Sequence, residues 1–360
     1  MEKLVKKTDN AIPERGIRSS NIELLRILAM VVIVAHHYFV NSGLPYAVAS
    51  KEVLSATDYF LLLFGWGGKT ATNCFVLITG YFMCTADFKM KKFFRLLGEH
   101  YFYTIIIWCI FFFSGYEAFS LKEVLNVLFP FLAVKRNFVQ CFLLFYLLIP
   151  FLNKMIHALN EREHLLLIAW CMGIYVVLPS LAKATVDFNY ITWFSVIYIL
   201  ASYIRLYPKK WLDNCRLTGL LALASLLLSW LSIVVIAANS NNIPGIDLRS
   251  SYFFISCNKI PAFATSVFAF LFFKNLKIGY SKLINTVAAS TFGVLLIHGN
   301  SNTMRRWLWQ DVCNNVGVYE NGNGNVVIHA LLCTAAVYIA CTGIDMARRA
   351  VAKKLMRRNG

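Results

Sequence analysis

Long apolar runs separated by short polar or basic segments make up most of this chain. The first run, Ile22–Val40, is followed by a ten-residue apolar piece, Tyr59–Gly68. A helix needs about 20 largely apolar residues to cross the hydrocarbon layer, so the ten-residue piece is too short to span it. The pattern predicts ten membrane-spanning helices. Their expected ranges are Ile22–Val40, Thr70–Ala86, Gly98–Gly115, Phe138–Asn153, Leu165–Leu181, Tyr190–Tyr207, Leu217–Ala238, Tyr252–Phe273, Leu283–Ser301 and Val326–Ile344.

The segments between these runs are short. We expect a polar outer loop over Asn41–Asp58 and a Gly- and Asn-rich loop over residues 316–325. Glu123–Val134 is apolar but short, and is expected to lie at the membrane interface or to re-enter it. No repeat divides the chain. We therefore expect an N-terminal tail over residues 1–20, one membrane domain over residues 21–346 and a basic tail over residues 347–360.

The basic residues alternate with the apolar runs. The chain has 35 Lys and Arg residues, of which 24 fall in segments on one side of the predicted layout and 8 on the other. Cytoplasmic loops of membrane proteins carry the excess of Lys and Arg, so both termini are predicted to be cytoplasmic. The net charge of +17 therefore reflects topology and does not indicate binding to nucleic acid.

Composition supports an all-α polytopic membrane protein, since 58% of the residues are hydrophobic and 15% are charged. The ten cysteines are scattered without metal-ligand spacing, so they are interpreted as small buried apolar residues and no metal site is predicted. The basic N-terminal segment leads into the first apolar run without a small-residue cleavage site, so that run is expected to be a retained anchor.

The first apolar run carries Arg26 near its start and the pair His36 and His37 near its end. In a helix Arg26 and His37 differ by about 20° around the axis and by about 16 Å along it, whereas His36 lies about 80° from Arg26. A cation and an imidazole on one face must point into protein or water, which indicates a functional site. The alternative is an arginine that reaches the membrane surface and a histidine that bonds another helix.

Polar residues within the membrane segments form two groups by predicted depth. Lys259 stands out because it falls about two turns into its predicted span. Polar residues at both depths favour a polar path through the protein. The inner group is Arg26, Thr79, Arg95, Glu99 and His100, and the outer group is His36, His37, Asn258, Lys259 and His298, with Gln140 and His329 at outer entrances.

Several of these residues fall in segments that resemble a known family. Arg26 and His37 match the R-X10-H signature of the integral-membrane acyltransferase family 3, which contains bacterial surface-polysaccharide O-acyltransferases. Other segments resemble the family in the same order along the chain, with Thr79 in place of serine and Lys92 in place of the first arginine of its RxxR segment. These segments are Phe75–Met83, Lys91–Leu97, Phe142–Asn153, Val196–Arg205 and Ser290–His298.

The resemblance implies a ten-helix enzyme of the bacterial cytoplasmic membrane. Such an enzyme moves an acyl group, usually acetyl, from cytoplasmic acyl-CoA to a hydroxyl of a glycan or lipid-linked saccharide. It also implies that Arg26 and His37 form the catalytic pair. Acyl-CoA would be a donor substrate, so no permanently bound cofactor is expected. The oligomeric state is left open.

The residue types suit this chemistry. An imidazole with a pKa near 6.5 is largely neutral at pH 7, so His37 can act as a base or as an acyl-carrying nucleophile. Arg26 and a basic cluster containing Lys92 and Arg95 could meet the phosphates and pantetheine of CoA, although such clusters also serve as topology determinants. Thr79, His36, His298 and Lys259 are further candidate substrate-binding residues, and His37 and His298 are expected to line one cavity because they lie at similar depth.

Two other functions remain open from the sequence. A transporter or flippase for a lipid-linked sugar would also line a path with polar residues, but such proteins often contain inverted repeats. A polysaccharide polymerase would be expected to have larger outer loops than the longest one here, over residues 302–325. Acyl-CoA turnover would separate an acyltransferase from a transporter.

Overall fold

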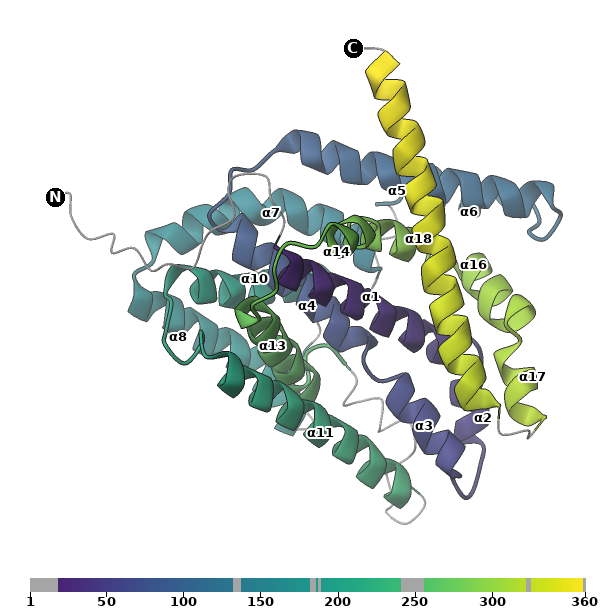
Figure 1. Cartoon of the computed structure of the whole chain (residues 1–360), viewed down its shortest axis with the longest axis horizontal. Coiled ribbons are helices and arrows are strands. Elements are labelled where there is room, and N and C mark those ends of the chain that lie inside the picture. The colour runs from purple at the N-terminus through teal and green to yellow at the C-terminus, as the bar shows by residue number, and fades with distance from the viewer. Residues whose placement is uncertain are drawn as a thin grey trace.

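The computed structural model describes residues 19–131, 137–181, 186, 189–240, 256–321 and 325–358, and in these residues the chain forms helices and no strands (Figure 1). Two π-helical turns, Gly173–Val177 and Trp307–Val312, interrupt the α-helices. The α-helices are α1 (Ser20–Val40), α2 (Leu44–Ala49), α3 (Ala56–Phe64), α4 (Gly68–Met83), α5 (Met90–Phe113), α6 (Leu121–Leu128), α7 (Phe138–Ala158), α8 (Glu161–Met172), α9 (Leu178–Leu181), α10 (Tyr190–Leu206), α11 (Cys215–Asn239), α13 (Ile260–Asn275), α14 (Lys282–Ala288), α15 (Thr291–His298), α16 (Asn302–Arg306), α17 (Asn315–Glu320) and α18 (Val326–Arg358).

Within the described residues, seven helical segments are long and apolar enough to cross a membrane, or eight if one bent pair is counted as a span. The shorter apolar helices α10 and α13 coincide with two further predicted spans. The prediction of an all-helical, multi-span membrane protein is confirmed, whereas ten spans and cytoplasmic termini stay predictions. The seven segments are Ser20–Val40, Ala56–Met83, Met90–Phe113, Phe138–Ala158, Glu161–Leu181, Cys215–Asn239 and Val326–Leu355.

The second segment is longer than the sequence predicted. The apolar piece Tyr59–Gly68 was expected to be separate, but α3 and α4 form one apolar segment of 28 residues, Ala56–Met83. The short connection contains Gly65 and Gly67, where a Cβ atom would lie 2.5 Å from the Phe39 ring and 2.4 Å from a Val32 methyl group. The missing side chains let this connection lie directly against α1.

The predicted ninth span is broken. Helices α14 and α15 are separated at Ala289 and Ser290, and the segment Lys282–His298 meets Asn302–Glu320 at an angle of 95°. The segment after Ser301 was expected to be a loop, but it contains α16, a π-helical turn and α17. The Gly- and Asn-rich composition of residues 316–325 therefore did not prevent a helix over Asn315–Glu320.

The last helix extends beyond the predicted tenth span. Helix α18 continues from Val326 to Arg358, so most of the predicted basic tail over residues 347–360 is helical. Several predicted segments lie partly outside the described residues. They are the N-terminal tail (residues 1–18), residues 132–134 of the short apolar piece and residues 252–255 of the eighth span.

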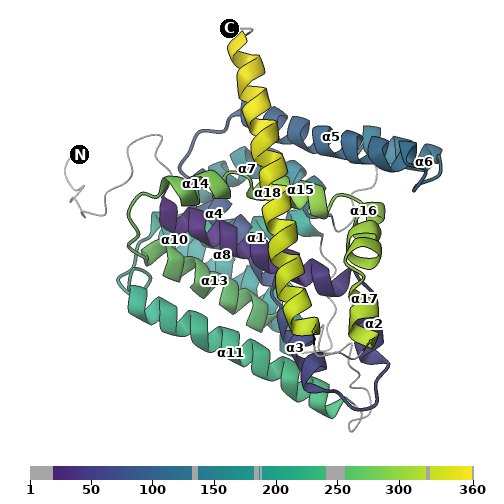
Figure 2. The ribbon, with the colours of Figure 1, turned by 45° about the vertical axis from the view of Figure 1, so that its right-hand side comes forward.

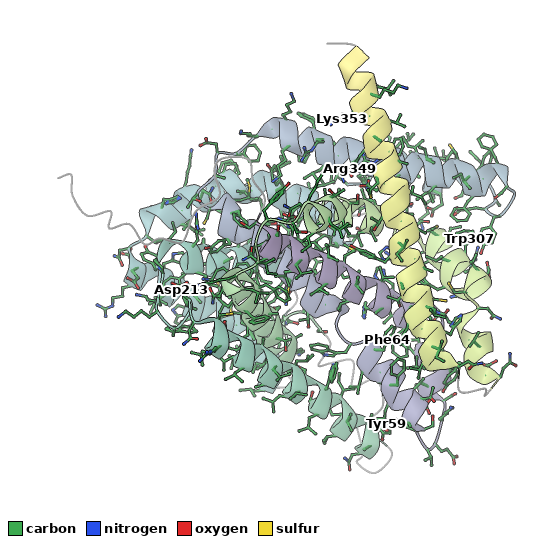
Figure 3. The ribbon with its side chains drawn as sticks, in the orientation of Figure 1. Tyr59, Phe64, Asp213, Trp307, Arg349 and Lys353 are labelled. Carbon is green, nitrogen blue, oxygen red and sulfur yellow. The ribbon has the colours of Figure 1, made fainter. Side chains whose placement is uncertain are left out.

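Helix α1 lies in the middle of the bundle, with α4 and α13 on one side and α14, α15 and α18 on the other (Figures 1 and 2). Large apolar side chains of α11 are exposed, including Leu220, Leu228 and Leu231, as expected for a helix that faces lipid. We call the end of the bundle where α1 begins the inner end, and the end where it finishes the outer end. Figure 3 labels a residue near each: Asp213, which accepts a hydrogen bond from Lys274 Nζ at 2.6 Å, and Tyr59.

The outer end of α1 is held by buried hydrogen bonds. The Tyr38 hydroxyl contacts His329 Nδ1 of α18 at 2.9 Å, and Asn315 Nδ2 donates to the Tyr38 carbonyl at 2.8 Å. Tyr38 and Asn315 are fully buried. These bonds connect α1 to α17 and α18, so they fix the depth and rotation of the neighbouring His36 and His37.

Candidate active site

Two histidines from distant parts of the chain meet at the outer end of α1. His37 Nδ1 lies 3.0 Å from His298 Nε2, and the ring centroids are 5.0 Å apart. Helix α1 supplies His37, and the last residue of α15 supplies His298, which is fully buried. The structure thus brings together the two histidines that were expected to line one cavity.

The hydrogen bonds of His298 determine where the protons of the pair lie. His298 Nδ1 is 2.6 Å from the Val294 carbonyl oxygen, which can only accept, so Nδ1 of His298 carries the proton. In a neutral ring, Nε2 of His298 is then an acceptor, and Nδ1 of His37 must donate to it. The remaining nitrogen of His37, Nε2, keeps its lone pair. This assignment follows from the bonding network and leaves His37 with a basic nitrogen.

His37 lines a cavity of about 210 Å³ that also contains two cationic side chains. Lys69, near the start of α4, donates from Nζ to the Tyr190 hydroxyl of α10 at 2.5 Å. Arg305 of α16 lines the same cavity and donates from Nη2 to the Gly299 carbonyl at 3.0 Å. An imidazole with an available lone pair can take a proton, and the two cations beside it can stabilise an oxyanion.

His36 makes a different contact from its neighbour. Its Nδ1 lies 2.5 Å from the Gly65 carbonyl oxygen, so it donates a hydrogen bond across to the α3–α4 connection. A Cβ atom at Gly68 would lie only 2.3 Å from the His36 ring, so the ring packs against the α4 backbone. His36 also borders the cavity of His37. The observed contacts indicate that His36 holds α4 against α1.

The predicted inner residues do not converge on this cavity. Arg26 forms an ion pair with Glu23 at 3.7 Å, and its side chain is 34% exposed. Lys92 and Arg95 are exposed at the start of α5, and Lys92 Nζ lies 5.7 Å from the centre of the Tyr146 ring. Thr79 donates to the Phe75 carbonyl of its own helix at 2.9 Å. None of these four residues lines the His37 cavity.

Contrary to the sequence prediction, Lys259 does not lie two turns into a helix. Helix α13 begins at Ile260, and Lys259 is the residue that precedes its first turn. Pro261 favours this start because proline is well accommodated in a first turn, where its missing N–H is not needed. The buried Lys259 ammonium donates to the Pro179 carbonyl of α9, so the observed contact joins two helix ends.

Sequence reasoning did not place Lys69, Tyr190 or Arg305 at the cavity of His37. The sequence offered one indication for Lys69, because it is a single cation between two apolar pieces. Its hydrogen-bond partner Tyr190 begins a different predicted span, so the sequence did not indicate that the two residues meet. Nothing in the sequence indicated Arg305, since it falls in a segment expected to be an outer loop. His100 was placed near the inner face, but it lies midway along α5 and borders a cavity that contains residues of the outer end.

Comparison with known proteins gives a family match over most of the chain. A family model described as an acyltransferase domain matches residues 19–345. None of the curated proteins and none of the solved structures compared with the chain matches it. The matched range includes every helix that contributes to the histidine pair and its cavity.

Proposed function

Since the chain belongs to the acyltransferase family 3, we propose that it moves an acyl group, in the first instance acetyl, from cytoplasmic acyl-CoA to a sugar hydroxyl. The acceptor would be a cell-surface polysaccharide or its lipid-linked precursor, and the location the bacterial cytoplasmic membrane. The apolar helices support a multi-pass membrane acyltransferase. This assignment favours acyl transfer over the transport of a lipid-linked sugar.

The hydrogen-bonded histidine pair is the observation that carries this proposal. His298 donates to the Val294 carbonyl and in turn accepts a hydrogen bond from Nδ1–H of His37, which leaves His37 Nε2 as the available base. When Nε2 takes a proton, His37 becomes an imidazolium whose Nδ1–H bond to His298 is charge-assisted and stronger. His298 would thus act as a positioning residue that also stabilises the protonated base.

In the proposed reaction His37 Nε2 removes the proton from the acceptor hydroxyl as that oxygen attacks the thioester carbonyl carbon. A tetrahedral oxyanion forms, and the Lys69 ammonium and Arg305 guanidinium are the groups available to stabilise it. The intermediate collapses by breaking the carbon–sulfur bond. The departing thiolate takes the proton from His37, so the products are the O-acyl ester and free CoA.

The same residues support a two-step route. His37 Nε2 could attack the thioester itself, release CoA and hold the acyl group until the acceptor hydroxyl arrives. Stable labelling of the protein by [14C]acetyl-CoA without acceptor, lost in His37→Ala, distinguishes this route from direct transfer.

The donor would enter from the inner end. Arg26 lies about 16 Å along α1 from His37, a separation that an extended pantetheine arm can cover. Arg26, Lys92 and Arg95 would then meet the phosphates of CoA while the thioester reaches His37. Their positive charge and exposure at the inner end support this role.

The test is acyl-CoA turnover by the purified protein in liposomes. Release of CoA from [14C]acetyl-CoA, and transfer of label to total surface polysaccharide from the cells in which the protein occurs, should both depend on His37. His37→Ala should insert normally and lose both activities. Absence of CoA release and of transfer in the wild-type protein, or full activity in His37→Ala, would reject the mechanism.

A further inference from the structure

Two cysteines from different helical segments meet at the outer end of the bundle. Cys313 ends the π-helical turn Trp307–Val312, and Cys333 lies about two turns after the start of α18. Helix α17, which follows Cys313, lies beside the start of α18 (Figures 1 and 2). The two thiols are in hydrogen-bond contact with each other, and both are only partly buried. Two thiols that touch across separate helices can be joined by a covalent bond.

An imidazole lies beside this cysteine pair. His329 Nε2 is 3.3 Å from Cys333 Sγ, and His329 Nδ1 is 2.9 Å from the Tyr38 hydroxyl oxygen of α1. When Nδ1–H donates to this oxygen, Nε2 of the neutral ring is an acceptor for the Cys333 thiol proton. The thiolate, and not the thiol, is the form that attacks a disulfide. His329 is therefore placed to generate the attacking form of Cys333.

The compartment expected at the outer end favours oxidation of the pair. The bias of Lys and Arg residues predicts that the inner end faces the cytoplasm, so the outer end faces away from it. Disulfides form and persist outside the cytoplasm. A disulfide requires the two sulfur atoms to approach to about 2.05 Å, and thiols that already touch can reach this distance by side-chain rotation.

We propose that Cys313 and Cys333 form a disulfide that links the segment Asn302–Glu320 to α18. Cys333 gives its thiol proton to His329, and its sulfur attacks an external protein disulfide or small-molecule disulfide, displacing one half as a thiolate. The Cys313 sulfur then attacks the Cys333 sulfur of the mixed disulfide and displaces the other half. The two departing thiolates take the proton held by His329 and the proton of Cys313. The protein loses two electrons, and the external disulfide gains them.

The disulfide would fix a segment that borders the His37 cavity. Arg305, on the same segment as Cys313, lines that cavity. Trp309 of this segment is fully buried and meets Tyr38 edge-on, with ring centroids 6.0 Å apart. A bond to α18 closes a loop of about 20 residues, and such a cross-link stabilises a protein mainly by restricting its unfolded chain. Oxidation should therefore raise the thermal stability of the protein, whatever reaction it catalyses.

The test counts the thiols that are oxidised in the protein as cells make it. Cells that express the protein are lysed in SDS with N-ethylmaleimide, which blocks every free thiol. Dithiothreitol then reduces disulfides, and a maleimide coupled to polyethylene glycol tags the thiols that are released. The wild-type protein should gain two tags, whereas Cys313→Ser and Cys333→Ser should gain none.

Cys109→Ser is the matched control, because Cys109 is also a partly buried thiol, in α5. It should gain two tags, like the wild-type protein. Absence of tags on the wild-type protein, or two tags on Cys313→Ser, would overturn the inference.

Thermal unfolding in detergent measures what the bond does. Dithiothreitol should lower the melting temperature of the wild-type protein by about 4–10 °C and should leave that of Cys313→Ser unchanged. An equal fall in both proteins, or no fall in either, would reject the stabilising link to α18. Neither measurement uses acyl transfer, so the inference stands or falls independently of the proposed function.

The role of His329 has its own readout. After reduction and removal of dithiothreitol, oxidised glutathione should restore the bond, about tenfold more slowly in His329→Ala than in the wild-type protein at neutral pH. The difference should shrink at higher pH, since more of the thiol then ionises without a base. Equal rates of oxidation at neutral pH would overturn the role assigned to His329.

Discussion

The two ends of α1 differ in how their polar residues are arranged. At the outer end, helices α1, α4, α10 and α16 bring His37, Lys69, Tyr190 and Arg305 around one cavity, and α15 places His298 against His37. At the inner end, Arg26 pairs with Glu23 within its own helix, and Arg95 projects from the start of α5. The outer end therefore has the organisation expected for chemistry, and the inner end that of a charged entrance.

This difference shows that two residues on one helix face need not share a site. Arg26 and His37 have the same orientation around α1, but about 16 Å of helix separates them. The histidine contacts residues from other helices, whereas the arginine forms an ion pair with Glu23 of its own helix. Catalysis and donor binding are thus predicted to respond differently to mutation.

The largest effect is expected from removing the base at the outer end. His37→Ala should lower acyl transfer about 10²–10⁴-fold, the contribution usual for a general base. His36→Ala is the matched neighbour and should keep measurable activity, because its ring bonds to the Gly65 carbonyl. Transfer of label from [14C]acetyl-CoA measures both. An equal loss in the two variants would show that the pair acts as one unit.

The next effect is expected from the cation beside the base. Lys69→Met keeps a side chain of similar length and removes the charge that is available to an oxyanion, so turnover should fall about 10²–10³-fold. Tyr190→Phe removes only the partner of the ammonium group and should have a smaller effect. A Lys69→Met enzyme with normal turnover at saturating acetyl-CoA would remove Lys69 from the chemical step.

The positioning role of His298 predicts an intermediate loss of turnover. His298→Ala removes the acceptor for His37 Nδ1–H and should lower turnover about 10–100-fold, the range seen when the hydrogen-bond partner of a metal-bound imidazole is removed. His298→Gln retains an oxygen that can accept this bond and should recover part of the activity. The pH profile of turnover should shift in His298→Ala and return toward wild type in His298→Gln. Identical losses and pH profiles in the two variants would indicate a packing role only.

The inner end should respond in donor affinity rather than in turnover. Arg26→Ala should raise the KM for acetyl-CoA about tenfold with little change in kcat, the result expected when a charged hydrogen bond to the donor is lost. Arg95→Ala should raise it less, by an amount that shrinks as salt is added, since exposed charges are screened. Loss of kcat at unchanged KM in Arg26→Ala would place this arginine in the chemical step.

The smallest effect on rate is expected from the packing around His36. Gly68→Ala places a methyl group against the His36 ring and should destabilise the protein by about 1–3 kcal/mol, with a modest loss of turnover. Gly98→Ala is the control in α5, where a Cβ atom would meet nothing within 4 Å. Thermal unfolding in detergent compares the two. Equal stability would contradict the observed contact between α1 and α4.

Several features were predictable because they depend on local pattern. Apolar runs of span length identified most long helices, since backbone polar groups in a membrane must bond within a helix. The R-X10-H spacing identified His37. His298 was singled out because it lies at a depth similar to that of His37, in a predicted span that runs in the same direction. Lys259 was misplaced because the apolar run continues across a helix start that Pro261 sets.

By itself, the sequence determined the membrane class, the family, and the helix face that carries Arg26 and His37, because these follow from composition, motif and helical period. Only the tertiary structure decided that His298 accepts a hydrogen bond from His37, that Lys69 and Arg305 border the same cavity, and that Arg26 stands apart. Those contacts join residues as far as 261 positions apart. They arise from the packing and bending of helices, notably at the glycines beside α1 and the bend after α15. Periodicity along one chain does not encode how two helices meet.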